Sequence, residues 1–424
     1  MNENELFREI VRSGILTLSP QRVNMTMLER EMAFIESRHL ESYFNVAHKI
    51  IARLKWDNEF MVGPGRGWMI RSYVCWAMGI TFINPESLGL EPLLTWCDEN
   101  NNPIINICVD DDSFYSVYNK VIEWFGYNNV ALMPAMLSDK SVMDMHNAYA
   151  LLICQDGCIS DYYPVQEITD GNDFKIICTK EFIAECDNKT VFRFNILKSH
   201  ELTRIKRIQE LIMANRKTCP QFGDRDIQDV NYAVIRSGSY KGIPFFGSLQ
   251  QYEINIRLLL QDSYHAEFHY MLNAMALFIK GVGQSLKSKN DVDEYQHKHG
   301  IHPRWHMYEF PWGILYKEDV AHFLNRWISF TWKQTAHIME LIEKPDEGEI
   351  EKMKQIYLQK GMENAYCHEE LQVIWDSIFN STENEQLFSK ADLAGELYLS
   401  VFLARLKAEY REEFMQQYEE EKSL

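Results

Sequence analysis

The sequence predicts an α+β protein, and three observations support that class. Two apolar stretches rich in β-branched residues, PIINICV at 103–109 and VFRFNIL at 191–197, have the composition of buried strands. Further strand candidates lie at 148–154 and 175–178, and helical periodicity recurs at 5–14, 28–38, 44–54 and 113–125. Beyond residue 250 long helical patterns dominate. We therefore expect a mixed part and then a mainly helical part, divided near residue 205.

Composition indicates a globular protein with a large core. The chain has 424 residues, of which 46% are hydrophobic and 25% charged. It contains no apolar run long enough to span a membrane, so we expect no membrane association. The polar start MNENELFREIVRSG is unlike a signal peptide, and nine cysteines occur without CxxC pairs. These features favour reduced thiols and a cytoplasmic location.

The net charge of −18 restricts nucleic-acid binding to local patches, because a DNA-binding surface is usually basic. Three basic runs, at 198–207, 216–217 and 280–289, are the candidates for such patches. The alternative is that they are ordinary solvated faces.

The glycine-rich loop VGPGRG at 62–67 stands between two expected helices. Its three glycines let backbone N–H groups approach a ligand, and Arg66 adds a positive charge. The expected helix at 71–78 would direct its first N–H groups toward the same place. The loop is therefore either an anion cradle or a plain tight turn.

The order of several motifs resembles the bacterial C-family DNA polymerases, the family of the DNA polymerase III alpha subunit. LEREMAFI at 28–35, VGPGRG, and GIT at 79–81 followed by Asn84 and Pro85 resemble the entry to the family's palm. His146 falls at the histidine of the family's HAGG segment. WGILYKEDV at 312–320 and the block at 388–415 resemble family motifs of the fingers, whereas 127–190 and 208–275 match poorly.

The resemblance implies a mixed-sheet, nucleotidyltransferase-like palm at 1–205 and a mainly helical, fingers-like domain at 206–424. The family's thumb would be reduced to a short link near 127–145. Because the similarity covers palm and fingers only, we expect a reduced homologue.

The positions that hold catalytic carboxylates in the family carry other residues here. Nucleotidyl transfer needs two divalent ions about 3.5–4 Å apart, held by carboxylates. The family's D-x-D-x-D run corresponds to Ile104, Asn106 and Cys108, and its aspartate on the neighbouring strand corresponds to Asn195. Losing these charges weakens ion binding by several kcal/mol each at an effective dielectric constant of about 20. We therefore expect no catalytic residues and no metal cofactor.

The nucleotide-binding positions are partly retained. Gly65, Arg66, Gly67, Ser72 and Lys390 match the family and form a vestigial nucleotide site. By contrast, Trp68 replaces a serine that cups the triphosphate and would fill phosphate space. The segment at 279–282 is IKGV where the family has RPGP, the segment at 340–344 lacks the family's basic run, and Asp392 replaces a histidine.

An alternative keeps catalysis through a displaced carboxylate pair. Asp110 and Asp112 follow the expected strand with the same parity as Ile104 and Asn106 and could bind Mg²⁺. However, four residues along a strand span about 13 Å, and the spacing from Pro103 onward is unchanged. The other interpretation is an acidic turn or helix start.

Other candidate sites are weaker. Zinc could bind histidines with helical or clustered spacing, although no thiolate or HExxH context supports this: His265, His269, His297, His299, His302 and His306. Four tryptophans are expected in the core rather than on a base-stacking surface: Trp305, Trp312, Trp327 and Trp332.

The leading hypothesis is a catalytically inactive pseudo-polymerase that binds DNA or an unidentified protein partner. One alternative is an active DNA-directed DNA polymerase that uses Asp110 and Asp112. Another is a structural or interaction subunit of a mobile-element or defence system.

Overall fold

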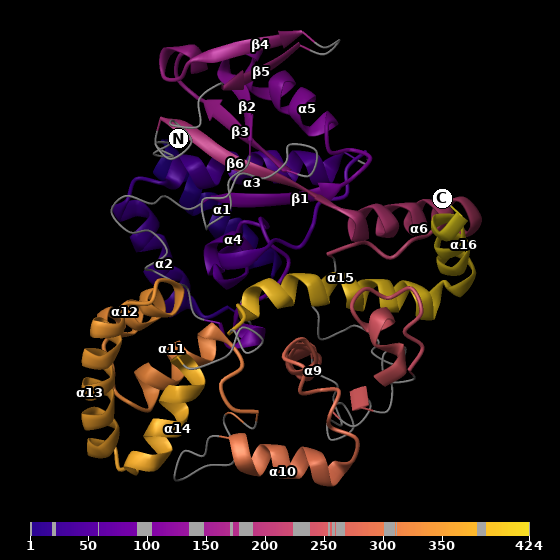
Figure 1. Cartoon of the computed structure of the whole chain (residues 1–424). Coiled ribbons are helices and arrows are strands. Elements are labelled where there is room, and N and C mark those ends of the chain that lie inside the picture. Colours follow the sequence, from indigo (N-terminus) through magenta and orange to yellow (C-terminus); the bar gives the residue numbers. More distant parts are fainter. Residues whose placement is uncertain are drawn as a thin grey trace. The chain divides into compact units, whose positions relative to one another are not determined.

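The computed structural model describes residues 2–18, 23–57, 59–90, 104–134, 148–169, 173–177, 190–223, 238–252, 255–256, 259, 268–300, 310, 312–379 and 387–423. It confirms the α+β class (Figure 1). The chain forms two compact units, residues 1–231 with 401–424, and residues 232–400. None of the helices within the described ranges is both long and apolar enough to cross a membrane.

The first unit is built on a six-stranded mixed sheet with the order β1-β6-β3-β2-β5-β4. β1 and β6 are parallel, β6 and β3 are antiparallel, and so are β3 and β2. The strands are β1 (Ile105–Asp110), β2 (Val130–Pro134), β3 (Ala148–Cys154), β4 (Val165–Thr169), β5 (Asp173–Ile177) and β6 (Val191–Ser199).

The helices of this unit lie before, between and after the strands in sequence. They are α1 (Glu3–Thr17), α2 (Met25–Ser37), α3 (Glu41–Trp56), η2 (Gly67–Arg71), α4 (Tyr73–Ala77), η3 (Glu86–Leu88), α5 (Ser116–Phe125), η4 (Tyr127–Asn129), η5 (Ile159–Asp161), α6 (His200–Arg216) and α16 (Arg411–Ser423). Asn24 accepts a hydrogen bond from Met27 N and is the N-cap of α2.

The core of the first unit lies between α3 and the sheet. The Tyr43 hydroxyl donates to the Arg193 carbonyl at 2.9 Å and accepts from the Ile105 amide at 2.8 Å. The Tyr43 ring also stacks on Phe194 at 4.9 Å between centroids. α3 is thereby attached to β1 and β6 at the point where the two strands pair.

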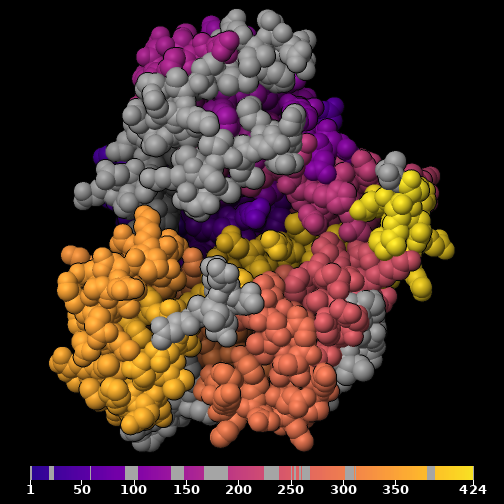
Figure 2. Space-filling view, in the orientation of Figure 1, coloured from indigo at the N-terminus to yellow at the C-terminus, as the bar shows by residue number. Residues whose placement is uncertain are grey.

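The second unit is helical, as predicted for the later part of the chain. Its elements are η8 (Phe246–Tyr252), α9 (Phe268–Ile279), α10 (Lys289–His299), α11 (Lys317–Arg326), α12 (Trp332–Glu343), α13 (Glu347–Glu363) and α14 (His368–Phe379). α15 (Lys390–Glu409) crosses from this unit into the first. Figure 2 shows the outer surface of α12 and α13 in orange.

The compact units do not divide at residue 205, which lies inside α6. α6 continues directly from β6 and packs against both β1 and α16, so it stays with the sheet. The expected short link at 127–145 also differs, because its first part forms η4 and the central strand β2. Val130–Pro134 pairs with β3 and β5 through its backbone, and this pairing depends on distant strands. His146 lies outside the described residues.

Candidate functional site

The glycine-rich loop at 62–67 is attached to the edge strand β1. Val62 forms an antiparallel bridge with Val109, and the Gly63 amide donates to the Cys108 carbonyl at 2.9 Å. A Cβ on Gly63 would lie 3.1 Å from the Cys108 Cβ. The start of the loop therefore extends the sheet by a short backbone contact and leaves little room for a side chain.

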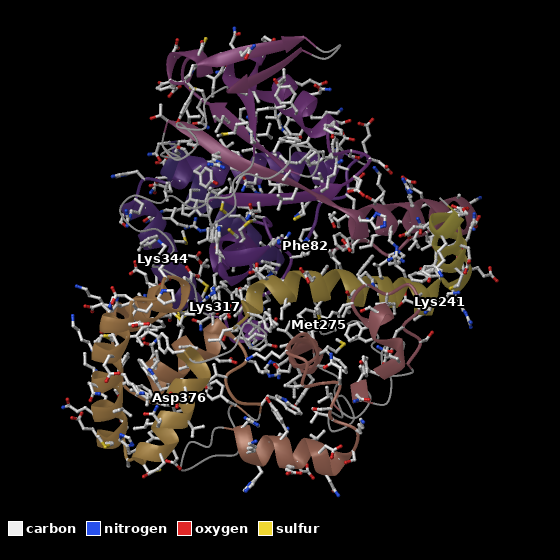
Figure 3. The ribbon with its side chains drawn as sticks, viewed as in Figure 1. Phe82, Lys241, Met275, Lys317, Lys344 and Asp376 are labelled. Atoms are coloured by element: carbon white, nitrogen blue, oxygen red, sulfur yellow. The ribbon has the colours of Figure 1, made fainter. Side chains whose placement is uncertain are left out.

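The centre of the loop is a tight turn against residues 81–82. Gly65 has a φ of +98°, and a Cβ at that position would lie 2.5 Å from Thr81 Cγ2. The Phe82 amide donates to the Pro64 carbonyl at 3.1 Å, and Phe82 is labelled in Figure 3. Gly67 also has a positive φ, +62°. The two glycines meet conformational and packing needs of the turn itself.

Arg66 and Ser72, two residues of the predicted nucleotide site, have different environments. The Arg66 side chain is exposed. Its charge opposes the effect of burial, which raises the pKa of the Cys108 thiol to about 11. Ser72 is buried, and its hydroxyl accepts from the Cys75 amide at 2.9 Å as the N-cap of α4. Arg66 can reach a ligand, whereas Ser72 already has a structural role.

A buried glutamate, which sequence reasoning missed, lies at the amino end of α4. Glu31 from α2 is 0% exposed, and its Oε2 accepts from the Val74 amide at 3.1 Å. Burial raises the pKa of this carboxyl to about 7, opposed by hydrogen bonds from Ser72, Val74 and Tyr73. The first N–H groups of α4 therefore face a carboxyl group of the chain itself.

Trp68 is anchored to the start of β1. Its indole Nε1 donates to the Ile104 carbonyl at 3.0 Å, and its ring packs against the core of the first unit. Beside it, the Asn106 amide donates to Met69 Sδ at 3.1 Å. The residue that replaces the family's serine thus connects the glycine-rich loop to the strand that carries Asn106.

Asn106 and Asn195 form a side-chain pair across β1 and β6. They are register partners, and Asn195 Nδ2 donates to Asn106 Oδ1 at 2.9 Å. Asn195 is buried, and its Oδ1 has no hydrogen-bond partner. The donor set consists of two neutral amides, one of which already uses its oxygen. It does not fit a divalent-ion centre, which needs converging carboxylates.

Asp110 lies at the end of β1 and is 0% exposed. Its Oδ2 accepts from the Met61 amide at 2.8 Å, and its Oδ1 accepts from the Ser113 amide and hydroxyl at 3.1 and 2.9 Å. Lys206 Nζ donates to the same Oδ1 at 3.0 Å. The carboxylate therefore joins the glycine-rich loop, β1 and α6, and its oxygens are used within the chain.

The other two acids of the triplet also face α6. Asp112 accepts from Arg207 at 3.1 Å, and Asp111 Oδ2 lies 3.4 Å from His200 Nδ1. The acidic triplet and the basic run at 198–207 thus neutralise each other in three pairs. This arrangement is the acidic turn of the sequence analysis, and much of the basic run is not available as a free DNA-binding patch.

Lys390 belongs to the second unit, where it begins α15. Its backbone N–H donates to Glu318 Oε2 at 2.8 Å, and its ammonium lies 5.6 Å from the centre of the Tyr316 ring. Burial lowers the pKa of Lys390, against the charges of Asp319 and Glu318. The nearby Lys317, labelled in Figure 3, pairs instead with Glu343 at 3.0 Å.

The predicted histidine and tryptophan sets are only partly described. His265, His302, His306 and Trp305 lie outside the described residues. His269 Nε2 lies 3.3 Å from Asn273 Nδ2, and His299 stacks on Tyr295. Within the described ranges no group of three His, Cys, Asp or Glu side chains could hold a metal ion.

The three described tryptophans of that set differ in exposure. Trp312 is buried and Trp327 packs against the core, as expected, whereas Trp332 is 44% exposed.

Comparison with known proteins shows what this chain is similar to. Residues 5–190 match the family model described as the bacterial DNA polymerase III alpha NTPase domain. DNA polymerase III subunit alpha of Aquifex aeolicus (strain VF5) is 23% identical over 498 residues, which cover 91% of this chain and 41% of that protein. An error-prone DNA polymerase of Pseudomonas syringae pv. tomato is 28% identical over 130 residues, covering 30% of this chain and 12% of that polymerase. The chain spans less than half the length of these relatives.

A mixed sheet with a glycine-rich turn on its edge strand, followed by a helical region, defines a nucleotidyltransferase-like protein. Within that class, this chain is a divergent homologue of the bacterial C-family DNA polymerases.

Proposed function

We propose that this chain is a non-catalytic member of the polymerase family that acts by binding DNA or a protein partner. One observation carries the proposal: Asn106 and Asn195, which the resemblance assigns to two family carboxylate positions, hydrogen-bond to each other at 2.9 Å. In that pair Asn195 Nδ2 already occupies Asn106 Oδ1, and two neutral amides carry no charge that would attract a divalent ion.

The relatives support DNA as the first ligand to test, because they carry the names of DNA polymerases. Arg66 is the residue of the vestigial nucleotide site that is best placed to contact a phosphate, since its side chain is exposed. Gly65 and Gly67 shape the turn that presents it. A ligand bound there would meet the loop through one cation rather than through metal-bridged phosphates.

The environment of the acidic triplet argues against catalysis by Asp110 and Asp112. Asp110 is buried and accepts four hydrogen bonds, one of them from the ammonium of Lys206. Asp112 is bound by Arg207. An ion would have to displace both cations, and moving a buried carboxylate away from its partner costs several kcal/mol.

The test is primer extension with Mg²⁺ and with Mn²⁺, alongside binding of the same primer–template by fluorescence anisotropy. We expect no extension, with binding that weakens as salt rises if DNA is the ligand. Asp112→Asn is the matched variant, because Asp112 lies on the surface and its loss should not unfold the chain. Template-directed extension that is lost in Asp112→Asn would overturn the proposal.

A further inference from the structure

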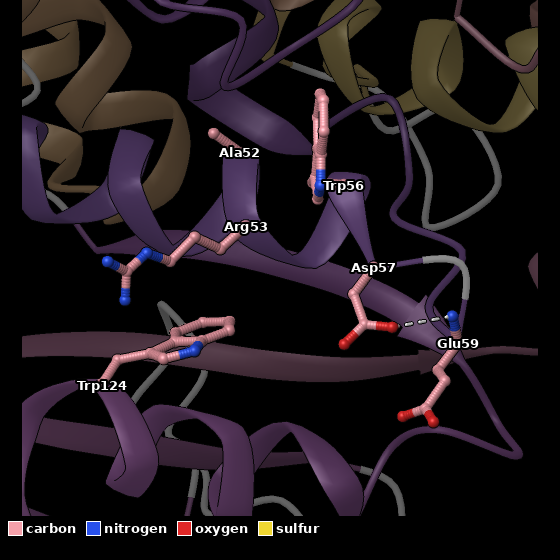
Figure 4. A pocket seen from close by; sticks show the side chains of 6 residues that line it. All are labelled: Ala52, Arg53, Trp56, Asp57, Glu59 and Trp124. Carbon is pink, nitrogen blue, oxygen red and sulfur yellow. Dashed lines mark hydrogen bonds between the residues drawn. The ribbon is translucent and has the colours of Figure 1, made fainter.

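A second candidate binding site lies on the outer surface of α3 and α5. It is an open cleft of about 820 Å³, lined by Ala52, Arg53, Trp56, Asp57, Glu59 and Trp124 (Figure 4). Tyr43 of α3 stacks on the Phe194 ring and accepts a hydrogen bond from the Ile105 amide, so the side chains of Phe194 and of its register partner Ile105 face α3. Because side chains alternate along a strand, Asn106 and Asn195 face away from α3. The cleft is therefore on the opposite side of the sheet from the polymerase-family site.

The cleft has an unusually exposed aromatic residue. Trp56 is 89% exposed at the end of α3, although large aromatic side chains are normally well buried. Trp124 from α5 is partly buried and packs against the core of the first unit. Figure 4 shows both indoles in the wall of the cleft. A flat aromatic ligand would remove apolar area of Trp56 from water that the chain itself leaves exposed.

One end of the cleft carries the positive charge of Arg53, and Lys49, on which Glu3 acts, lies one turn earlier on α3. Arg53 lies over the Trp124 ring, with its Cζ 5.3 Å from the ring centre, and Lys49 lies 4.6 Å from the centre of Phe125. Neither cation forms an ion pair within the described parts of the chain. Lys49, Arg53 and Trp56 are spaced by four and three residues, so they share one face of α3. A phosphate could contact these cations without displacing a carboxylate.

The other end of the cleft is acidic. Asp57 and Glu59 lie 3.3 and 3.8 Å from Lys120 Nζ, and Glu123 also acts on this lysine. The carboxylate of Asp57 accepts from the Glu59 amide (Figure 4). Three acids share one cation here, which leaves acceptor oxygens for N–H groups of a ligand. Carboxylates accept from exocyclic amino groups of nucleobases in this way.

We propose that this cleft binds one nucleotide unit of single-stranded nucleic acid. The base stacks on Trp56, its amino groups face Asp57 and Glu59, and the phosphate contacts Arg53 and Lys49. Arg53, the two indoles and the carboxylates of Asp57 and Glu59 line one cleft, and these groups are complementary to the phosphate, the base and the amino groups of a nucleotide. This inference does not rest on the proposed function, because the two sites are on opposite faces of the sheet.

The test measures binding of a fluorescein-labelled, mixed-sequence 12-nucleotide DNA strand to the whole chain by anisotropy. Trp56→Ala should weaken binding about fivefold or more, because stacking of one base on an aromatic side chain contributes at least this factor. Arg53→Gln should weaken binding and lower the dependence of log affinity on log salt by about one. Trp332→Ala is the control, since it removes another exposed tryptophan, and should leave the affinity unchanged.

Further arms identify the ligand. Deoxyadenosine monophosphate competing in a Trp56-dependent manner would extend the assignment to free nucleotides, and failure to compete would restrict it to strands. Unchanged affinity of Trp56→Ala, or no binding of the strand at all, would overturn the inference. If a poly-glutamate peptide bound the chain and Trp56→Ala weakened its affinity by the same factor, the inference would also be overturned, in favour of an acidic protein partner. None of these outcomes decides whether the chain extends a primer, so failure of one proposal is distinguishable from failure of the other.

Discussion

The asparagine pair across β1 and β6 can be replaced by two carboxylates. In the double variant Asn106→Asp with Asn195→Asp, the hydrogen bond of 2.9 Å is replaced by two like charges at the same register position of β1 and β6. We expect this variant to be less stable than the natural chain without metal, and to recover stability when Mg²⁺ or Mn²⁺ is added.

The magnitude follows from the geometry. Two unit charges about 4 Å apart repel by about 4 kcal/mol at an effective dielectric constant of 20, and the lost hydrogen bond adds about 1 kcal/mol. The variant can reduce the repulsion by holding one proton, because a like charge raises the pKa of one of the two carboxyls. A loss of about 3 kcal/mol at pH 8 is therefore expected. A divalent ion at 100 times its dissociation constant would return about 2.7 kcal/mol.

The assay is thermal unfolding at pH 8, with EDTA or with millimolar Mg²⁺ or Mn²⁺, and also at pH 5. The single variant Asn106→Asp is the control, because Asn195 Nδ2 can still donate to the new carboxylate and a charged acceptor strengthens that bond. It should lose little stability. If the double variant were as stable as the natural chain in EDTA, or insensitive to divalent ions, the two side chains would not face each other as the reasoning requires.

The remaining predictions concern buried and paired ionisable groups. The carboxyl of Glu31 has a pKa of about 7 in the folded chain, above its usual value, so its stabilising effect is complete at low pH and is lost as pH rises to 7. Glu31→Gln should remove that fall in stability between pH 4.5 and 7, which amounts to about 3 kcal/mol. Urea titrations of both proteins across this pH range measure the difference, and identical pH dependence of their stabilities would contradict the prediction. Burial lowers the pKa of His200, but Glu421 and Asp111 together raise it by more than burial lowers it, so the net shift is upward. The contribution of His200 to folding stability is therefore complete below its unfolded pKa and is lost as pH rises through its folded pKa. His200→Ala should weaken the contact between α6 and α16 more at pH 6 than at pH 9, and limited proteolysis of α16 measures this. Asp110→Asn removes the carboxylate that pairs with Lys206 and should lower the free energy of unfolding by roughly 3 kcal/mol, measured by chemical denaturation. If it lowered stability no more than the loss of an exposed acid does, the prediction would be wrong.

Local patterns accounted for most of the elements of the first unit. Residues 148–154 form a strand with the expected bounds, and 191–197 forms most of β6. The short strands β2 and β4 were missed, because five residues with a mixed pattern carry little periodicity and become strands only when neighbours supply the hydrogen bonds. The start of α4 was also placed too early, since η2 precedes it and Ser72 caps it.

The sequence named the residues of a candidate site but could not give their contacts. The resemblance singled out Asn106 and Asn195, yet 89 residues separate them, and only the parallel pairing of β1 with β6 brings their amides into contact. The acidic triplet at 110–112 and the basic run at 198–207 were noticed as separate features. Their mutual pairing could not be foreseen from spacing, because it depends on where α6 begins relative to the end of β1.

The sequence by itself determined the α+β class and the position of the glycine-rich turn, and it predicted asparagines where the resemblance implies metal-binding carboxylates. These properties are local, since they depend on composition, on periodicity and on which residue occupies a position. Only the tertiary structure decided that the asparagines hydrogen-bond to each other, that Asp110 is buried beside Lys206, and that Trp56 is left exposed in a cleft beside Arg53. Each of these depends on burial and on partners far away in the chain, and side-chain chemistry at one position does not specify its partner.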